Sequence, residues 1–138
     1  MEIKIYNKFP DSAKTIREEV FIKEQGFSYH IDEADSIATH LVILDEDVPI
    51  GTCRIFEGEK NGIYVLGRLA VKKEYRLKGI GSMLVKSATE YVKNIGGISL
   101  ILHSQLRAKS FYLKLGFKEY GEIEYEAGCP HIWMKTEF

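Results

Sequence analysis

The sequence has little cysteine, with only Cys53 and Cys129 in its 138 residues. Two cysteines are too few for a disulfide framework, and their spacing matches no zinc-binding pattern. We therefore expect two reduced thiols and no bound metal. A chain of this length can bury most of its apolar surface without disulfide or metal support.

The chain also lacks a charge excess and a long apolar run. Lysine and arginine together number 19, against 20 for aspartate and glutamate, so the formal net charge is −1. Nucleic-acid-binding domains usually carry a basic patch or stripe, which this balance does not favour. No apolar run approaches the roughly 18 residues of a membrane helix, and residues 1–6 alternate instead of forming a signal-peptide core. The sequence thus predicts a cytoplasmic protein with no membrane and no nucleic-acid partner.

Helix and strand patterns alternate along the chain, with no repeats and no linker. Apolar runs or alternating patterns predict strands at residues 2–6, 40–44, 50–56, 63–71, 98–102, 117–125 and 131–136. Apolar residues at helical spacing predict helices over residues 11–25, 80–95 and 108–115. The polar stretch 27–39 is predicted to be a loop that includes at most one helical turn. We therefore predict one α+β domain over residues 1–138.

The clearest functional pattern is Arg-Leu-Lys-Gly-Ile-Gly at residues 76–81, between a predicted strand and the longest predicted helix. The first N–H groups of a helix have no intrahelical partner, and the helix dipole adds partial positive charge there. Gly79 and Gly81 allow the backbone to approach an anion closely. Such a junction of strand, glycine loop and helix is suited to binding a phosphate.

Two common phosphate-binding motifs do not fit this segment. A P-loop needs Lys and then Ser or Thr after the second glycine, whereas Ser82 and Met83 follow Gly81. A dinucleotide-binding fingerprint needs a third small residue at the position that Leu84 occupies. On its own, the segment leaves open a plain glycine turn before a helix.

The segment resembles the Gln/Arg-x-x-Gly-x-Gly/Ala signature of the Gcn5-related N-acetyltransferase (GNAT) superfamily. Arg76, Gly79 and Gly81 stand at the signature positions. Residues 108–117 resemble the family's second signature, a helix that carries a tyrosine and ends in Gly-Phe. Two signatures in the right order, separated by a helix and a strand, make a chance similarity improbable.

Three further segments are similar to a narrower group, the ElaA-like acetyltransferases, and they lie at residues 17–25, 32–35 and 128–134. The resemblance therefore spans nearly the whole chain. It implies an α+β fold whose central mixed, mostly antiparallel sheet contains a splayed parallel strand pair and is flanked by helices. The acceptor substrates of this group are poorly defined, so the resemblance says little about the acceptor.

The resemblance also implies acetyl-CoA as a co-substrate. In the family a bulged strand pairs with the pantetheine arm, and the glycine loop holds the pyrophosphate; Gly67 lies where such a bulge fits. The positions that match are Leu69, Ala70, Val71, Arg76, Leu77, Lys78, Gly79, Ile80, Gly81, Ser82 and Gln105. The backbone N–H of Val71 would polarise the thioester carbonyl. Gln105 departs from the family pattern, because many relatives have asparagine there.

The implied reaction is direct attack of an amine, on a small molecule or a peptide, on the thioester carbonyl. Tyr112 matches the family's general acid. A phenol titrates near pH ~10 and a thiol near ~8.5, so Tyr112 is expected chiefly to hydrogen-bond the developing thiolate. The general base stays open, and the candidates on different segments are Glu24, Glu33, His40, His103 and His131. A relay through water would need no dedicated base.

Other interpretations of the sequence also stay open. The same fold could serve as a non-catalytic acyl-CoA-binding regulatory or interaction module. The acidic runs at 32–35 and 45–47 either attract a cationic acceptor or are solvated loops. A homodimer through the C-terminal strands is a further possibility, suggested by analogy with small domains of the superfamily.

Overall fold

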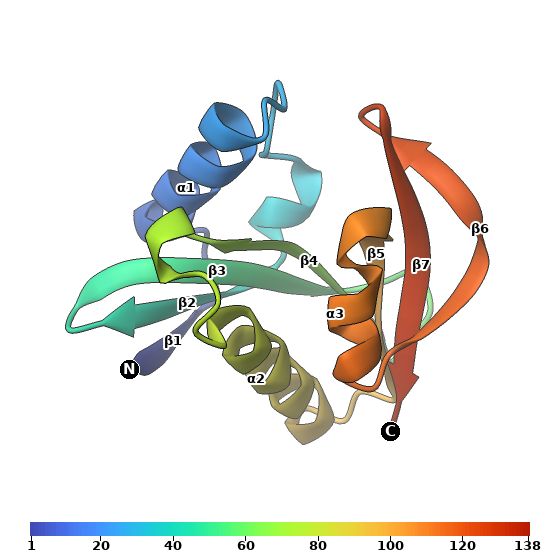
Figure 1. Cartoon of the computed structure of the whole chain (residues 1–138). Coiled ribbons are helices and arrows are strands. Elements are labelled where there is room, and N and C mark those ends of the chain that lie inside the picture. The colour runs from blue at the N-terminus through green and yellow to red at the C-terminus, as the bar shows by residue number, and fades with distance from the viewer.

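The computed structural model describes residues 1–138 and contains one seven-stranded sheet with helices against it (Figure 1). The strands are β1 (Glu2–Tyr6), β2 (Thr39–Asp45), β3 (Val48–Glu57), β4 (Ile63–Val71), β5 (Ser99–Gln105), β6 (Lys118–Glu126) and β7 (Cys129–Glu137). The α-helices are α1 (Asp11–Arg17), α2 (Ile80–Asn94) and α3 (Lys109–Lys114). A π-helical segment, η1 (Glu18–Glu24), follows α1, and short 3₁₀ turns are η2 (Glu33–Ser36), η3 (Lys73–Tyr75) and η4 (Leu106–Ala108). None of the helices combines the length and the apolar character that a membrane crossing demands.

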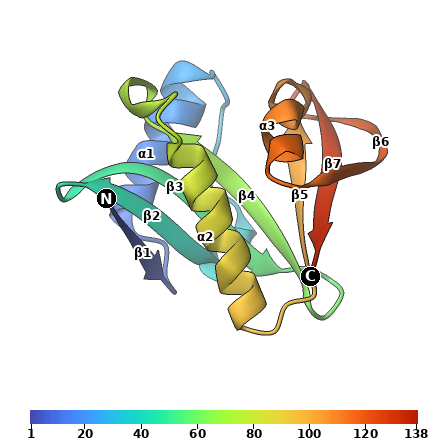
Figure 2. The ribbon, with the colours of Figure 1, turned by 60° about the horizontal axis from the view of Figure 1, so that its bottom comes forward.

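The strand order is β1-β2-β3-β4-β5-β7-β6, and only β4 and β5 run parallel. Their pairing joins residues 63–66 of β4 to residues 99–102 of β5, although β4 continues to Val71 and β5 to Gln105. The two strands therefore diverge beyond their paired halves (Figure 2). This confirms the predicted α+β class, the mixed sheet and its splayed parallel pair.

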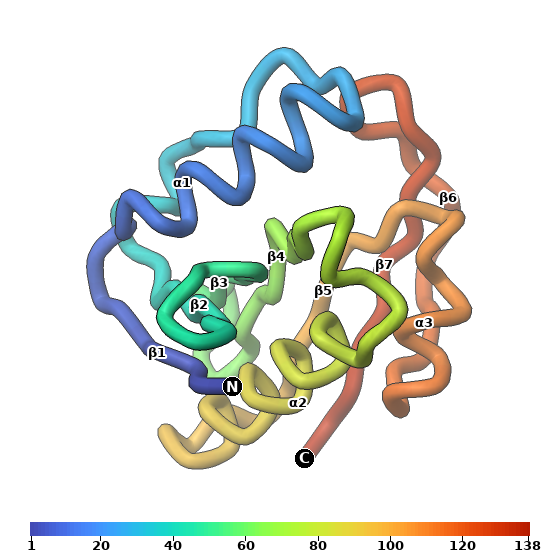
Figure 3. Tube along the Cα trace, turned by 60° about the vertical axis from the view of Figure 1, so that its left-hand side comes forward, coloured from blue at the N-terminus to red at the C-terminus, as the bar shows by residue number.

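Helices α1 and α2 cover opposite faces of the sheet (Figure 3). Alternation along β2 explains this arrangement, because successive side chains of a strand point to opposite faces. Leu41 and Ile43 belong to the larger core cluster under α2, whereas Val42 and Leu44 belong to the cluster that α1 covers. Both faces of this strand are therefore buried, as its continuous apolar run requires.

The first helix differs from the predicted single helix over residues 11–25. It ends as an α-helix at Arg17 and continues as the π-helical η1, in which the N–H of Gln25 donates to the carbonyl of Val20. A π-turn inserts one extra residue into the helix, and such insertions are often found at functional sites. The spacing of apolar residues does not reveal this local change.

The loop between η1 and β2 is tied to the sheet by ion pairs, of which those of Asp35 are buried. Asp35 accepts hydrogen bonds from Arg17 at 2.8 Å and from Arg54 at 2.9 Å. Asp32 accepts from Arg54 at 3.0 Å and from Arg68 at 3.1 Å. Three arginines thus offset the two aspartates. The acidic run therefore stabilises the fold, which leaves little free negative charge there to attract a cationic acceptor.

Strand β6 forms one edge of the sheet, and most of its side chains are exposed. Its register against β7 shifts between Tyr120 and Glu124, where Gly121 has a φ of 74°. Bulges of this kind blunt an exposed edge against further strand pairing. The homodimer through the C-terminal strands stays a prediction.

Candidate active site

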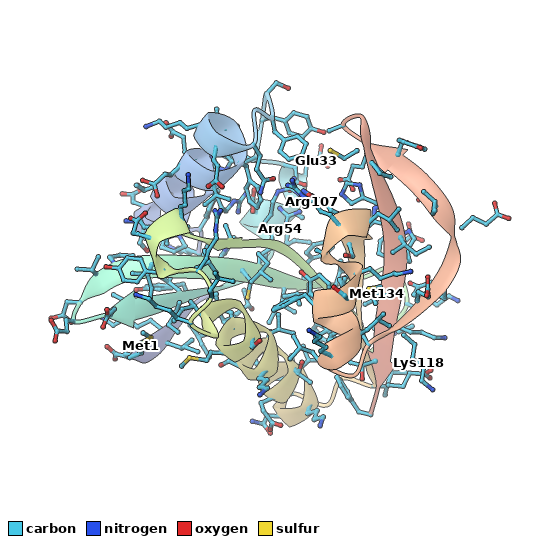
Figure 4. All side chains as sticks on the ribbon, viewed as in Figure 1. Met1, Glu33, Arg54, Arg107, Lys118 and Met134 are labelled. Carbon is cyan, nitrogen blue, oxygen red and sulfur yellow. The ribbon has the colours of Figure 1, made fainter.

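A cavity of about 680 Å³ opens where β4 and β5 diverge. The second halves of these strands, the start of α3, the end of η1 and the β6–β7 hairpin line it. Three arginines also line it: Arg68 from β4, and Arg54 from β3 and Arg107 from the turn before α3, which Figure 4 labels. Of the residues predicted for the site, this cavity brings together Leu69, His103, Gln105, Tyr112 and His131.

A second hollow of about 480 Å³ shares lining residues with this cavity, among them Gln105 and Arg107. Glu24 and Arg76 line only the second hollow. These predicted residues therefore fall into two adjoining spaces, one between the diverging strands and one between η1 and the loop before α2. Ala70, Val71 and the predicted residues 77–82 line neither space.

The bulge in β4 lies close to the predicted position. The register of β3 against β4 shifts between Thr52 and Arg54, opposite Gly67 and the residues that follow it. The positive φ, however, falls on Arg68 at 52°. A non-glycine residue in this region is strained, and such strain is common where a backbone serves a function.

The backbone of Val71 is directed toward the diverging edge of β4. The N–H of Lys72 donates to the carbonyl of Ile50 at 2.9 Å, across the β3 side. Since consecutive residues of a strand direct their polar groups to opposite sides, Val71 directs its own groups away from β3. Its carbonyl indeed accepts a hydrogen bond from Nε of Arg76 at 3.0 Å. We infer that the N–H of Val71 points to the same side.

The glycine loop ends in an α2 N-terminus that has no side-chain cap. Gly79 is the N-cap with a φ of 78°, and no side chain accepts a hydrogen bond from the first turn. Ile80 is buried in the core and anchors the start of the helix. Leu77 also has a positive φ, 63°, while its side chain is fully exposed. The first-turn N–H groups are thus presented on a sharply bent, firmly anchored loop, which suits an anion.

The second glycine of the loop has a packing role in addition to the predicted one. A Cβ at Gly81 would lie 3.3 Å from Cζ of Phe111, on α3. A side chain at this position would be tight against that ring and would require it to shift by a few tenths of an ångström, so glycine favours the close approach of the helix start to α3. A neighbouring position, Ser82, is partly buried in the first turn of α2 without this constraint.

Arg76 points to η1 instead of standing free beside the loop. Its guanidinium donates to both carboxylate oxygens of Glu24, with Nη2 2.6 Å from Oε1. The hydrogen bond from Arg76 holds the pKa of Glu24 below its usual range. A carboxylate held in this way is a weak base. This ion pair therefore links η1 to the loop before α2, and we call it the Glu24–Arg76 clasp.

His131 is held in one tautomer inside the cavity. Its Nδ1 lies 2.9 Å from the backbone carbonyl of Cys129, and because a carbonyl can only accept, Nδ1 carries the proton. In the neutral ring Nε2 is therefore a free lone pair. Nε2 makes no hydrogen bond, and Oε2 of Glu126 lies 3.8 Å away. The side chain is 9 % exposed, so its orientation is fixed by packing as well.

His103 lies beside His131, but its Nδ1 and one face of its ring already have partners. β5 extends to Gln105, so His103 lies within the strand and not at its end as predicted. Its Nδ1 donates to Oε2 of Glu126 at 3.0 Å, and its ring stacks on Trp133 with centroids 4.5 Å apart. Its Nε2 is buried and has no hydrogen-bond partner. This nitrogen cannot reach a substrate in the cavity without a rearrangement.

The two remaining base candidates do not line the cavity. Glu33 is exposed on η2. His40 is buried against Phe9, with ring centroids 4.8 Å apart, and its Nε2 donates to the carbonyl of Asp35 at 3.1 Å. Burial lowers the pKa of His40, so a neutral structural histidine is the best description of it.

Tyr112 projects from α3 into the cavity and is 8 % exposed. Its ring makes edge-to-face contacts with Phe111 at 5.0 Å and Phe117 at 5.9 Å. Burial raises the pKa of the Tyr112 phenol well above its usual range. The phenol therefore stays protonated at every physiological pH and can donate a hydrogen bond, whereas full transfer of its proton is strongly uphill.

The structure adds Glu124, Glu126 and Trp133 to the site, none of which the sequence suggested. All three line the cavity from the β6–β7 hairpin. The only sequence pattern that points to them is Glu-x-Glu in β6, since residues two apart in a strand share a face.

A diverging parallel strand pair beside a glycine loop and an uncapped helix start defines the class of acyl-group-transferring folds that the sequence resembles. The acetyltransferase (GNAT) domain family matches residues 9–138, and the chain belongs to this family. It is 35 % identical over 125 residues to the uncharacterized N-acetyltransferase YjcF of Bacillus subtilis, with 88 % of each chain covered. The resemblance inferred from the signatures is thus confirmed.

Solved structures share the fold over the whole chain. Escherichia coli ElaA is 24 % identical, with a TM-score of 0.88 and 99 % of each chain covered. An aminoglycoside 6'-N-acetyltransferase solved with coenzyme A is 18 % identical, with a TM-score of 0.76, and covers 99 % of this chain and 97 % of that one. At these identities the likeness concerns the fold.

Proposed function

We propose that the protein transfers an acetyl group from acetyl-CoA to an amine acceptor. The observation that carries this proposal is that two features meet at α3: the cavity between the diverging strands, which Tyr112 lines, and the uncapped α2 N-terminus, whose Gly81 packs against Phe111. The first accommodates an extended thioester arm, and the second an anionic pyrophosphate. Membership of the acetyltransferase family supports the same donor.

The donor would lie along the unpaired half of β4. Leu69 and Val71 direct backbone groups toward the divergence, so the pantetheine arm can pair with them as an added strand would. The backbone N–H groups of residues 79–82 would bind the pyrophosphate, with Lys78 nearby. In this arrangement Arg76 holds the loop in place through its hydrogen bonds to Glu24 and Val71. It would contribute to phosphate binding only through long-range electrostatic attraction.

The acceptor amine must be neutral before it attacks the thioester carbonyl, and in this proposal His131 takes its proton. The free Nε2 lone pair supports this role, and the carboxylate of Glu126 would stabilise the imidazolium that forms. The N–H of Val71 would polarise the carbonyl. Tyr112 would donate a hydrogen bond to the sulfur as negative charge develops on it.

Acetyl transfer and its donor site can be tested together by measuring thiol release from acetyl-CoA with a panel of primary amines. Ser82→Glu places a negative charge in the first turn of α2, where it favours the helix but repels a pyrophosphate. We expect it to weaken coenzyme A binding by about tenfold or more without lowering the free energy of unfolding, since each 1.4 kcal/mol of repulsion is a factor of ten.

The control is Ser82→Gln, which has the same shape as Ser82→Glu but no charge. It should bind coenzyme A within about twofold of the wild type. Equal coenzyme A binding by both variants would place the pyrophosphate elsewhere. Coenzyme A binding by the wild type without acetylation of any amine would favour a non-catalytic binding module.

Removal of the Tyr112 hydroxyl should affect turnover and not donor binding. We expect Tyr112→Phe to lower kcat by about a hundredfold, the scale of one lost donor to developing charge. The buried ring keeps its contacts with Phe111 and Phe117, so the dissociation constant of coenzyme A should stay the same. Steady-state kinetics and calorimetry separate the two effects. An unchanged kcat would remove Tyr112 from the chemistry.

A further inference from the structure

We infer that the acceptor carries a second positive charge in addition to the amine that is acetylated, and that Glu124 and Glu126 bind it. This inference rests on the proposed acetyl transfer. Diamines are the simplest compounds of this class.

The charges that line the cavity are divided between two sides. On the side of β3 and β4, Arg54 and Arg68 are paired with Asp32. Arg107, from the turn before α3, also lines the cavity; it forms no ion pair, and its Nε donates to Oε1 of Gln105 at 2.8 Å. On the side of the β6–β7 hairpin, Glu124 and Glu126 form no ion pair with a lysine or an arginine. Their contacts are with two histidines, which are charged only when protonated. The hairpin side of the cavity therefore has two uncompensated carboxylates.

Two histidines lie beside these carboxylates on the hairpin side of the cavity. His131 is more than nine-tenths buried and lines the cavity, and its Nε2 has no hydrogen-bond partner. His103 lies between the carboxylates, 3.0 Å from Glu126 and 3.6 Å from Glu124. The ring of Trp133 stacks on His103, with centroids 4.5 Å apart, and holds this imidazole in place between the carboxylates. An anionic acceptor would be repelled here.

The chemistry of attack explains why one positive charge is too few. The attacking amine gives up its proton to His131 and is neutral when the carbon–nitrogen bond forms. A monoamine then has no charge left for the carboxylates to hold. A second ammonium group keeps its charge throughout, so its attraction to Glu124 and Glu126 persists in the transition state and raises kcat/KM.

The test compares three acceptors of equal chain length: diaminobutane, butylamine and aminobutyrate. Thiol release from acetyl-CoA gives kcat/KM for each. We expect diaminobutane to exceed butylamine by about tenfold, because each partly exposed ion pair contributes only modestly to binding. Aminobutyrate should be the poorest of the three. The preference for the diamine should shrink as ionic strength rises, since salt screens exposed charges.

Variants of β6 test whether Glu124 and Glu126 cause the preference for the diamine. In Glu124→Gln and in the double variant with Glu126→Gln, the ratio of the diamine rate to the butylamine rate should fall toward one. Glu122→Gln, on the same exposed strand but outside the cavity lining, is the control and should keep the wild-type ratio. Denaturation midpoints confirm that each variant is folded.

The outcomes of these experiments distinguish the dicationic acceptor from the proposed acetyl transfer. A wild-type ratio near one, or an unchanged ratio in the double variant, overturns the dicationic acceptor while acetyl transfer to butylamine still supports the proposed function. No thiol release with any amine, despite bound acetyl-CoA, overturns the proposed function and this inference with it.

Discussion

Replacement of His131 by asparagine is expected to lower kcat by about a thousandfold, within the usual range for loss of a general base. The asparagine amide can still donate to the carbonyl of Cys129, as Nδ1 does at 2.9 Å. What the substitution removes is Nε2, the nitrogen with no partner inside the cavity. Because His131 contacts no part of the proposed pyrophosphate site, coenzyme A affinity should be preserved, which calorimetry would check.

The matched control is His103→Gln, one strand away. Its Nε2 is buried, so it cannot accept the amine proton, and a glutamine amide can maintain a hydrogen bond to Glu126. We expect kcat to fall by less than about tenfold in this variant. If the two variants lost activity equally, or if His131→Asn kept full activity, proton removal would have to pass through water or through another group.

The largest expected effect on stability comes from Asp35→Asn. Asp35 is 3 % exposed and accepts hydrogen bonds from Arg17 and Arg54, which are 1 % and 5 % exposed. Removal of the Asp35 charge leaves the buried Arg17 without a carboxylate partner, whereas Arg54 keeps Asp32. We therefore expect the free energy of unfolding to fall by about 3–5 kcal/mol, measured as a shift in urea midpoint. Asp47→Asn, in an exposed turn, should change it by less than about 0.5 kcal/mol.

The carboxylate of Asp35 is also expected to make the free energy of unfolding fall at low pH, which is the acid limb of the stability curve. Burial alone would raise the pKa of Asp35, but hydrogen bonds from Arg17, from the backbone of Asp32 and from Arg54 lower it well below its usual range. Its contribution to stability is therefore fully present above the unfolded pKa of ~3.9 and is lost as pH falls from there toward the folded pKa. Asp35→Asn should flatten this limb; an equally steep limb in the variant would assign the acid sensitivity to other carboxylates.

Elements with a strong local pattern were predictable from the sequence. The stripe of apolar residues defines α2, and the apolar run of β4 leads directly into the glycine loop. The proposed donor site lies, apart from Gln105, in one stretch of sequence, so its signature could be recognised from the sequence alone. The π-helical turn of η1 was not predictable, because it depends on how Val20 and Glu24 meet the sheet and the loop, and not on residue spacing.

The acceptor side could not be predicted, because it is assembled across strands. Which side chains of β6 face the cavity depends on the register shift near Gly121, and a shift of one residue exchanges the two faces of a strand. The choice between His103 and His131 rests on which ring nitrogen has a partner. The Glu24–Arg76 clasp joins residues 52 positions apart in the chain.

The clasp mechanically couples two parts of the fold that are far apart in the sequence. Arg76 binds Glu24 of η1 through Nη2 and the carbonyl of Val71 at the end of β4 through Nε. A displacement of η1 is therefore transmitted, through this single side chain, to Val71, the residue whose N–H is proposed to polarise the thioester carbonyl.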